Sequence, residues 1–258
     1  MRILWHSNAP WTPSGYGQQT AVWVPRIAGL GHDVMISAPY NFTGSPLRWN
    51  GFTVLPGGLD PVGNDVLAGH YKLHRADLLI TLCDLYAMDA SVLTGMHAAH
   101  WMPIDCAPMG VGDQATLRDG GGVPIAVSRF GERQLGAAGF APGYVPHGVD
   151  TALFRPPDDR DALRAGMGIG PGTFVVGMNG VNREDNRKAF PEQFAAFAAF
   201  HRRHENTRLM VHTLTNPPGA PDLAAIAADL GIADAVMFPD PHAYKSGLIS
   251  GSMLAAWY

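Results

Sequence analysis

The sequence has few cysteines, few charged residues and no long apolar run. Its two cysteines, Cys83 and Cys106, are fewer than a disulfide-stabilised secreted domain needs, so we expect two reduced thiols. The formal net charge is −4, which gives no basic field to attract nucleic acid and no charge-based support for membrane contact. No apolar run approaches the roughly 18 residues of a membrane span, and the short apolar stretch after Met1 is too small for a signal peptide. These absences predict a cytoplasmic protein.

What the sequence does contain suits a globular α/β protein. Apolar residues make up 47% of the 258 residues, enough for a packed core. The chain has 31 glycines and 21 prolines, which fall mainly between periodic segments. This distribution is typical of many tight junctions between strands and helices.

In the first part of the chain, strand-length apolar runs alternate with helical patterns. This alternation predicts a parallel sheet covered by helices. The nearly continuous apolar run at 77–83 is typical of a central strand buried on both faces. We expect strands at 2–6, 33–38, 52–55, 77–83, 100–104 and 124–127, and helices at 18–30 and 132–138.

The pattern is interrupted between 156 and 172 and then resumes. This stretch is rich in proline, aspartate and glycine, and we expect it to be a linker with one short helix. Three strand signals follow, which would leave an apolar sheet edge open, so the second domain is predicted to be incomplete or completed by a partner. We expect strands at 174–178, 209–214 and 236–239, helices at 191–201 and 222–230, and the start of a helix at 248–258.

The first candidate site is the loop Ser14-Gly15-Tyr16-Gly17, between the first strand and the first helix. Gly15 and Gly17 would let backbone N–H groups approach an anion at the N-terminus of the helix. The spacing lacks the third glycine of a dinucleotide-binding fingerprint, so a plain tight turn remains an alternative.

A second motif is more specific. Pro146-His147-Gly148-Val149-Asp150, followed by Phe154-Arg155-Pro156, resembles the interdomain hallmark of the family 4 retaining glycosyltransferases. Three other segments are similar to family segments in the expected order along the chain: Gly31-His32-Asp33-Val34, Trp101-Met102-Pro103-Ile104-Asp105 and Val127-Ser128-Arg129-Phe130-Gly131.

The resemblance spans nearly the whole chain and implies an α/β protein of the GT-B class, with two Rossmann-like domains built on parallel sheets. We expect an acceptor domain at 1–155, a linker at 156–172 and a partial nucleotide-sugar-binding domain at 173–258. The implied activity is transfer of a hexose from a nucleotide diphosphate sugar to an acceptor. No cofactor is implied, because the nucleotide sugar is a substrate.

The family holds the donor diphosphate with an arginine and a lysine five or six residues apart. Arg183 and Lys188 have this spacing here, and Arg187 is an alternative to Arg183. Two cations directed at a leaving diphosphate would stabilise the charge that develops on it. Gly15 and Gly17 are the candidates for further diphosphate contacts. No Asp-x-Asp metal signature is present, and family members generally work without a bound metal, so we expect no metal site.

The candidates for the reacting region lie at the end of a mid-domain strand. Asp105 follows an apolar strand, at the end where parallel sheets place their ligands, and would contact sugar or support a cationic transition state. His100, on the same strand, is the second catalytic candidate. His147, Gly148 and Asp150 are expected to form the interdomain hinge, with His147 fixing the turn.

One family segment is missing. A Pro-Ser-x3-Glu-Gly-Phe-Gly-like segment normally follows the helix that here ends at Trp257-Tyr258. Because that segment holds the donor's ribose and sugar, we expect residues 1–258 to show little transfer, and a longer reading frame to restore it.

Two other functions stay open at this point. The chain could be a non-catalytic GT-B fragment that binds a nucleotide or a sugar. A nicotinamide-dependent oxidoreductase is disfavoured, because the second strand ends in Ile36-Ser37-Ala38-Pro39 without an acidic ribose ligand. The sequence leaves open the sugar, the base (GDP, UDP or ADP) and the acceptor, whether carbohydrate, lipid, protein or another molecule.

Overall fold

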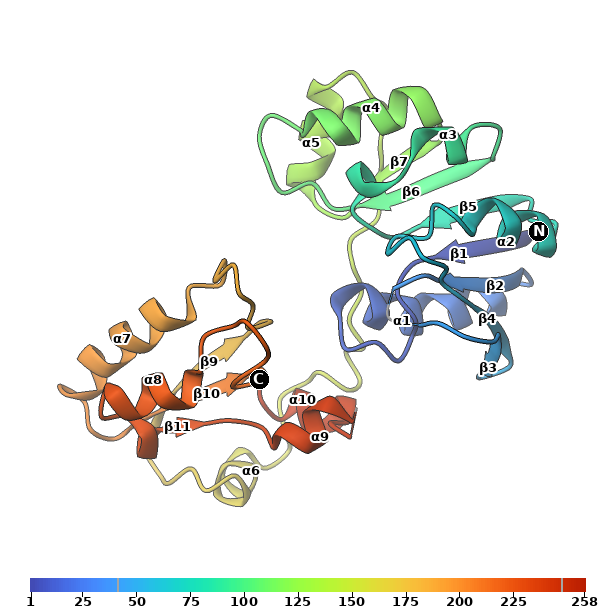
Figure 1. Ribbon diagram of the computed structural model, residues 1–258. Helices are drawn as coiled ribbons and strands as arrows, with labels where there is room; N and C mark the ends of the chain where they lie inside the picture. Colours follow the sequence, from blue (N-terminus) through green and yellow to red (C-terminus); the bar gives the residue numbers. More distant parts are fainter. Residues whose placement is uncertain (41, 247) are drawn as a thin grey trace. The chain divides into compact units, whose positions relative to one another are not determined.

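A computed structural model describes residues 1–40, 42–246 and 248–258. The chain forms two compact units, Met1–Val149 and Asp150–Tyr258 (Figure 1). Each unit has its own sheet and its own core.

The first unit is built on an eight-stranded sheet in the order β3-β4-β2-β1-β5-β6-β7-β8. Neighbouring strands are parallel except β3 and β4, which form an antiparallel pair at one edge. After β1, the chain adds β2, β4 and β3 on one side of that strand. It then returns to place β5 on the other side of β1, so the direction in which strands are added reverses between β1 and β5. The strands are β1 (Arg2–His6), β2 (Asp33–Ala38), β3 (Leu47–Trp49), β4 (Phe52–Pro56), β5 (Leu78–Thr81), β6 (Ala98–Met102), β7 (Val123–Ala126) and β8 (Gly143–Tyr144).

Side chains that alternate along the central strand build a core on each face of this sheet. Leu4 packs into one hydrophobic cluster with Leu117 and Leu135, whereas Ile3 and Trp5 pack into the other. The first cluster includes residues of α2 to α5 and the second includes residues of α1. The helices are α1 (Gly15–Gly29), α2 (Leu67–His74), α3 (Ala90–Leu93), α4 (Val111–Gly120) and α5 (Arg129–Ala137), with a 3-10 turn η1 (Leu85–Ala87).

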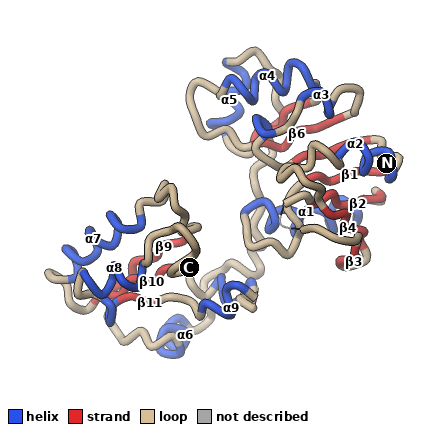
Figure 2. Tube along the Cα trace, in the orientation of Figure 1, coloured by secondary structure: helices blue, strands red, loops and turns tan. Residues whose placement is uncertain are grey.

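The second unit has a three-stranded parallel sheet in the order β11-β10-β9 (Figure 2). Its core contains Phe194, Phe197, Leu209 and Leu223, contributed by α7, β10 and α8. The strands are β9 (Phe174–Asn179), β10 (Thr207–His212) and β11 (Val236–Met237). The helices are α6 (Arg160–Gly166), α7 (Phe190–His201), α8 (Leu223–Asp229), α9 (Pro241–Lys245) and α10 (Gly251–Ala255), with a 3-10 turn η2 (Ala233–Ala235).

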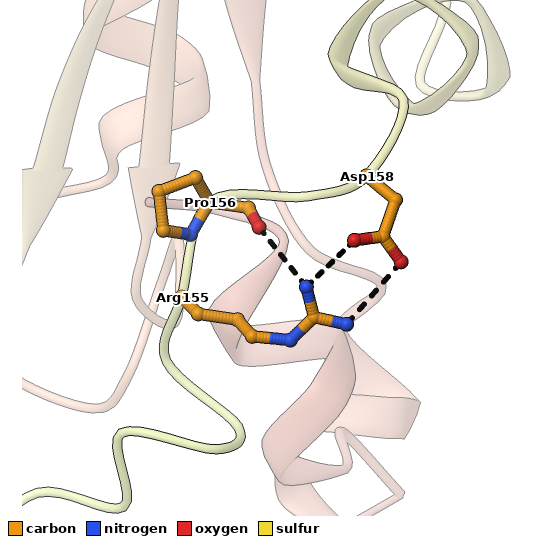
Figure 3. A network of polar contacts seen from close by, with 3 residues as sticks. All are labelled: Arg155, Pro156 and Asp158. Carbon is orange, nitrogen blue, oxygen red and sulfur yellow. Dashed lines mark hydrogen bonds and ion pairs between the residues drawn. The ribbon is translucent and has the colours of Figure 1, made fainter.

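The segment that opens the second unit is held by local polar contacts. The Arg155 guanidinium donates to both carboxylate oxygens of Asp158, at 2.8 and 3.3 Å, and to the Pro156 carbonyl at 3.5 Å (Figure 3). This ion pair is exposed, so solvent screens it and it adds little to the stability of the turn.

Among the helices that the structure describes, none is both long enough and apolar enough to cross a membrane.

Candidate functional site

The loop 180–189 follows β9 at the carboxyl end of the second sheet and is anchored by one buried side chain. The Asn182 amide nitrogen donates to the Pro221 carbonyl at 2.8 Å and to the Leu214 and Thr215 carbonyls at 3.4 Å. The Asn182 backbone N–H donates to Thr213 Oγ1 at 3.1 Å. These bonds fix the start of the loop to the segment that follows β10.

The three predicted donor cations all lie on this loop, after its anchored residue. The Arg183 side chain is 57% exposed and lies 3.9 Å from the Asp185 carboxylate. Arg187 and Lys188 are exposed as well. The Gln193 amide donates to the Lys188 carbonyl at 2.7 Å, which ties the end of the loop to α7. The loop therefore presents three cations to solvent from a backbone fixed at both ends.

The helix that follows these cations starts without a side-chain cap. Ala189 occupies the N-cap position of α7 with a left-handed φ of 50°, and no side chain accepts from the first turn. By contrast, aspartates or a serine cap α6, α8, α9 and α10. The N-terminus of a helix carries positive dipole charge, and here it directly follows Lys188. Pro191 has no N–H and Glu192 adds a carboxylate to the first turn, so the exposed cations of the loop are the groups that suit an anionic ligand.

In the first unit, the loop 14–17 forms the capped start of α1, and this role explains one of its two glycines. The Gly17 N–H donates to Ser14 Oγ at 3.1 Å, which caps α1. A Cβ at Gly17 would lie 2.3 Å from the Thr12 carbonyl oxygen, so only glycine fits there, whereas a Cβ at Gly15 would meet nothing within 4 Å. The turn thus accounts for Gly17, and diphosphate contact by Gly15 and Gly17 stays a prediction.

A polar pair marks the point where the strand order of the first sheet reverses. The Tyr16 hydroxyl, from α1, donates at 2.8 Å to Oδ1 of Asp84, which lies three residues beyond the end of β5. Burial and the adjacent Asp84 charge raise the pKa of Tyr16, so the phenol stays protonated. Ligands of open α/β sheets bind outside the carboxyl ends of the strands at such a reversal.

Two further carboxylates belong to the same region. Asp105 is exposed just beyond β6, where it was predicted. Asp113, on α4, accepts from the Tyr86 backbone N–H at 2.9 Å. This bond ties Asp113 to the segment that carries Asp84. Burial raises the pKa of Asp113, and the charges of Asp84 and Asp105 raise it further.

The other catalytic candidate, His100, lies inside the protein. It is fully buried, with Nδ1 2.9 Å from Thr81 Oγ1 and Nε2 3.1 Å from the Gly121 carbonyl oxygen. Because the carbonyl only accepts, Nε2 carries the proton and Nδ1 accepts from the Thr81 hydroxyl. Burial lowers the pKa of His100 and favours the neutral ring. This geometry favours a structural role, in which His100 joins β5 and β6 to the turn before β7.

The predicted hinge segment is tied to the first unit as far as Gly148. Gln19 of α1 donates to the Gly148 carbonyl at 2.8 Å and accepts from the Gly148 N–H at 2.9 Å. The His147 ring packs edge-on against Trp101 at 4.8 Å, and burial lowers its pKa. Asp150 begins the next unit by accepting from the Ala152 N–H at 3.0 Å.

Sequence reasoning did not identify Asp84 and Asp113 as site residues. Asp84 could have been found, because it directly follows the apolar run at 77–83. Asp113 could not, because α4 was not predicted. In residues 1–40, 42–246 and 248–258, no group of three or more His, Cys, Asp or Glu side chains is arranged to hold a metal ion.

No protein-family model matches the sequence, and no curated protein matches it significantly. Solved structures do match. A glycosyltransferase from Rickettsia africae matches with a TM-score of 0.60 and 13% identity, over 95% of this chain and 70% of its own. HepE from Anabaena, in complex with UDP and glucose, matches with a TM-score of 0.59 and 15% identity, over 96% of this chain and 71% of its own.

A UDP-GlcNAc 2-epimerase from Neisseria meningitidis, bound to UDP-GlcNAc, matches with a TM-score of 0.63 and 10% identity. The match covers 98% of this chain and 76% of the epimerase chain. These similarities establish the GT-B fold, with two Rossmann-like domains of which the second here has a three-stranded sheet.

Proposed function

We propose that this protein is a glycosyltransferase that moves a hexose from a nucleotide diphosphate sugar to an acceptor. The observation that carries the proposal is the loop 180–189, which presents Arg183, Arg187 and Lys188 beside the uncapped start of α7. Fold neighbours that are described as a glycosyltransferase, or as bound to UDP and glucose, support it.

The chemistry follows from where charge develops. When the bond between the sugar and the diphosphate breaks, negative charge accumulates on the leaving diphosphate. Lys188 and Arg183 would stabilise that charge, and the positive end of the α7 dipole would add to it. Such fixed cations and dipoles provide this stabilisation without a bound metal ion.

We infer a retaining mechanism from the resemblance of the 146–156 motif to family 4 enzymes. In that mechanism a donor phosphate oxygen takes the proton of the acceptor hydroxyl as it attacks, on the face that the diphosphate leaves. No protein side chain then has to act as the general base.

The acceptor would bind to the first unit, where Asp84, Asp105 and Asp113 follow the strands. The loops after β1, β2, β5 and β6 contain no lysine or arginine in the sequence. Carboxylates accept from hydroxyl or ammonium groups and repel phosphate. An acceptor rich in hydroxyl groups therefore suits this edge better than a phosphorylated one.

Release of nucleoside diphosphate from a panel of nucleotide sugars, with and without sugar acceptors, tests the proposal. We expect Lys188→Ala to lower kcat/KM by about a hundredfold, since a charged transition-state contact contributes roughly 3 kcal/mol. Lys72→Ala, which changes an exposed lysine of α2, is the matched control and should leave the rate unchanged.

Product analysis separates this proposal from its alternatives. An epimerised nucleotide sugar with no transferred hexose would identify an epimerase, the activity named for the Neisseria meningitidis neighbour. Nucleotide binding without turnover would identify the non-catalytic binding module.

A further inference from the structure

A chain of three hydrogen-bonded side chains lies near the carboxyl ends of β1 and β2 in the first unit. His6 ends β1 and Ser37 lies in β2, and both are buried, whereas His70 of α2 is partly exposed. The Ser37 hydroxyl oxygen lies 2.9 Å from His6 Nδ1 and 2.8 Å from His70 Nδ1. One hydroxyl group therefore joins a buried imidazole ring to a partly exposed one.

The inner end of this chain determines where its protons lie. His6 Nε2 lies 2.8 Å from the Val62 carbonyl oxygen. Because a carbonyl oxygen only accepts, Nε2 of the neutral His6 ring carries the proton, and Nδ1 accepts from the Ser37 hydroxyl. The Ser37 oxygen then accepts from His70 Nδ1–H, which leaves a lone pair on His70 Nε2. Each of the three bonds thus has one donor and one acceptor when both rings are neutral.

The same chain can accommodate one added proton but not two. A proton that binds His70 Nε2 allows the His70 Nδ1 proton to move to Ser37 Oγ, while the Ser37 hydroxyl proton moves to His6 Nδ1. The charge then lies on His6, and His70 is neutral with its proton on Nε2. With a second proton both rings direct an N–H at Ser37, so its hydroxyl can donate to neither ring.

The loop 57–66 covers the inner ring. Val62 supplies the carbonyl to which His6 donates, and the next residue, Gly63, lies so close that a Cβ there would be 3.0 Å from His6 Cε1. Asp60 holds the loop in this shape by accepting from the Val62 N–H at 2.9 Å. Because His6 is buried beneath the loop, a charge on its ring becomes hydrated when the loop lifts away.

The loop also supports the carboxylate edge of the first unit. The Asn64 side chain accepts from the Asp89 N–H at 2.8 Å and donates to the Ala87 carbonyl at 3.3 Å. Both partners belong to the segment after β5 that carries Asp84. Movement of the loop would therefore remove a support of that segment.

We infer that the chain His6–Ser37–His70 is an acid-sensitive latch, which holds the loop 57–66 closed while His6 is neutral and releases it when His6 gains a proton. This inference goes beyond the proposed function, because the latch works in the same way whether or not the protein transfers a sugar.

Burial of the inner ring sets the pH range of the release. Burial lowers the pKa of His6 to about 4, with a smaller lowering by His70, while the Val62 carbonyl and the Asp60 charge oppose the shift. When the loop is open, the hydrated ring has its ordinary pKa of about 6.5. The open form then binds more protons than the closed form, so the closed form loses stability as the pH falls from about 6.5 to about 4.

Two carboxylates of the loop face the histidines. Asp65 lies near His70, whose pKa is lowered by burial and raised in part by the Asp65 charge. Desolvation raises the pKa of Asp60, but the N–H groups of the loop that donate to it lower this pKa more, so the net shift is downward. Protonation of Asp60 therefore loosens the loop at a lower pH than protonation of His6 does, which separates the two effects.

Nitrogen-15 NMR of the histidine rings tests the latch in the unchanged protein. At pH 7 we expect the ring proton of His6 on Nε2 and that of His70 on Nδ1, and we expect His6 to stay neutral down to about pH 5. Amide exchange of the loop 57–66, corrected for the intrinsic effect of pH, should give an opening equilibrium about ten to thirty times larger at pH 5 than at pH 7.

His6→Gln removes the charge and keeps a side-chain N–H for the Val62 carbonyl, so opening of the loop should change less than about threefold between pH 7 and pH 5. His97→Gln is the matched control, because His97 is an exposed histidine of the same unit, and it should keep the full pH dependence. The latch is overturned if His6 of the unchanged protein titrates near pH 6.5, if loop opening is the same at both pH values, or if His6→Gln keeps the full dependence. The His6 titration decides the matter even if His6→Gln does not fold.

Discussion

At the scale of single residues, Asn182 is the side chain that anchors the loop 180–189, which carries Arg183, Arg187 and Lys188. Its amide donates to the carbonyls of Leu214, Thr215 and Pro221, and among the described residues only the Thr215 carbonyl has a second donor, the Leu223 N–H at 2.9 Å, so removal of the amide takes away the donor of the other two. We expect Asn182→Ala to lower the free energy of unfolding of the second unit by about 1–3 kcal/mol, as measured by chemical denaturation. It should also raise KM for the donor, because Arg183 and Lys188 lose their fixed position.

Asn216→Ala is the control for this prediction. Asn216 is exposed on the same stretch of chain and donates to the Asp222 carboxylate at 2.9 Å. Its loss should change the free energy of unfolding by less than about 1 kcal/mol. Equal effects of the two variants would show that Asn182 does not organise the loop.

Residue type and position predicted the exposure of some candidate residues but not the surroundings of others, and the roles of all of them stay predictions. Lys188 and Asp105 follow strands and lie exposed, as their places in the sequence suggested. His100 shares a strand with the segment before Asp105, yet it points into the interior, because its partners Thr81 and Gly121 come from neighbouring segments. Such pairings across strands are not visible in a single sequence.

At the scale of secondary-structure elements, the contact between α1 and the segment after β8 is testable. Gln19 forms two reciprocal hydrogen bonds with the Gly148 backbone, so α1 holds the predicted hinge segment. We expect Gln19→Ala to speed amide exchange of Gly148 by about tenfold or more, since a loss of roughly 1.5 kcal/mol changes an opening equilibrium by that factor.

Gln18→Ala supplies the comparison, because Gln18 is the adjacent residue of α1 and is exposed. Hydrogen exchange followed by NMR should show no change at Gly148 in that variant. Unchanged exchange in Gln19→Ala would mean that packing of His147 against Trp101 holds the segment without Gln19.

Element prediction succeeded where periodicity was strong and failed where buried residues were few. The ranges of β1 and β2 were predicted correctly, because both are bounded by clear turn signals. The helix α4 was missed, since it buries only Thr116, Leu117 and Gly120. The predicted strands at 77–83 and 100–104 extended too far at their carboxyl ends, because Leu82 and Ile104 are buried by packing beyond the last paired residue.

At the scale of the whole molecule, the GT-B fold was predicted from the 146–156 motif together with alternating strands and helices. Composition alone gave only the α/β class. The bounds of the short elements in the second unit could not be predicted as well, since β11 has two residues and α9 begins at Pro241, two residues after Pro239. Short elements of this kind are defined by tertiary contacts and not by their own sequence pattern.

The three hydrophobic clusters suggest that the two units unfold separately. Among the described residues, two clusters contain side chains only of 1–149, and the third contains only those of 150–258. We expect Phe194→Ala, which empties a fully buried site in α7, to destabilise the second unit by about 3–5 kcal/mol. Phe200→Ala, on the same helix but 37% exposed, should cost much less.

Hydrogen-exchange mass spectrometry follows the two units in one sample. In Phe194→Ala, peptides from β10 should lose protection while peptides from β5 keep theirs, because Phe194 and Leu209 of β10 belong to the same cluster and Leu79 of β5 belongs to another. Loss of protection in both sheets would contradict separate unfolding and would mean that the units form one cooperative structure. Selective loss would also show that the stability effect of a variant in the loop 180–189, such as Asn182→Ala, reports on the second unit alone.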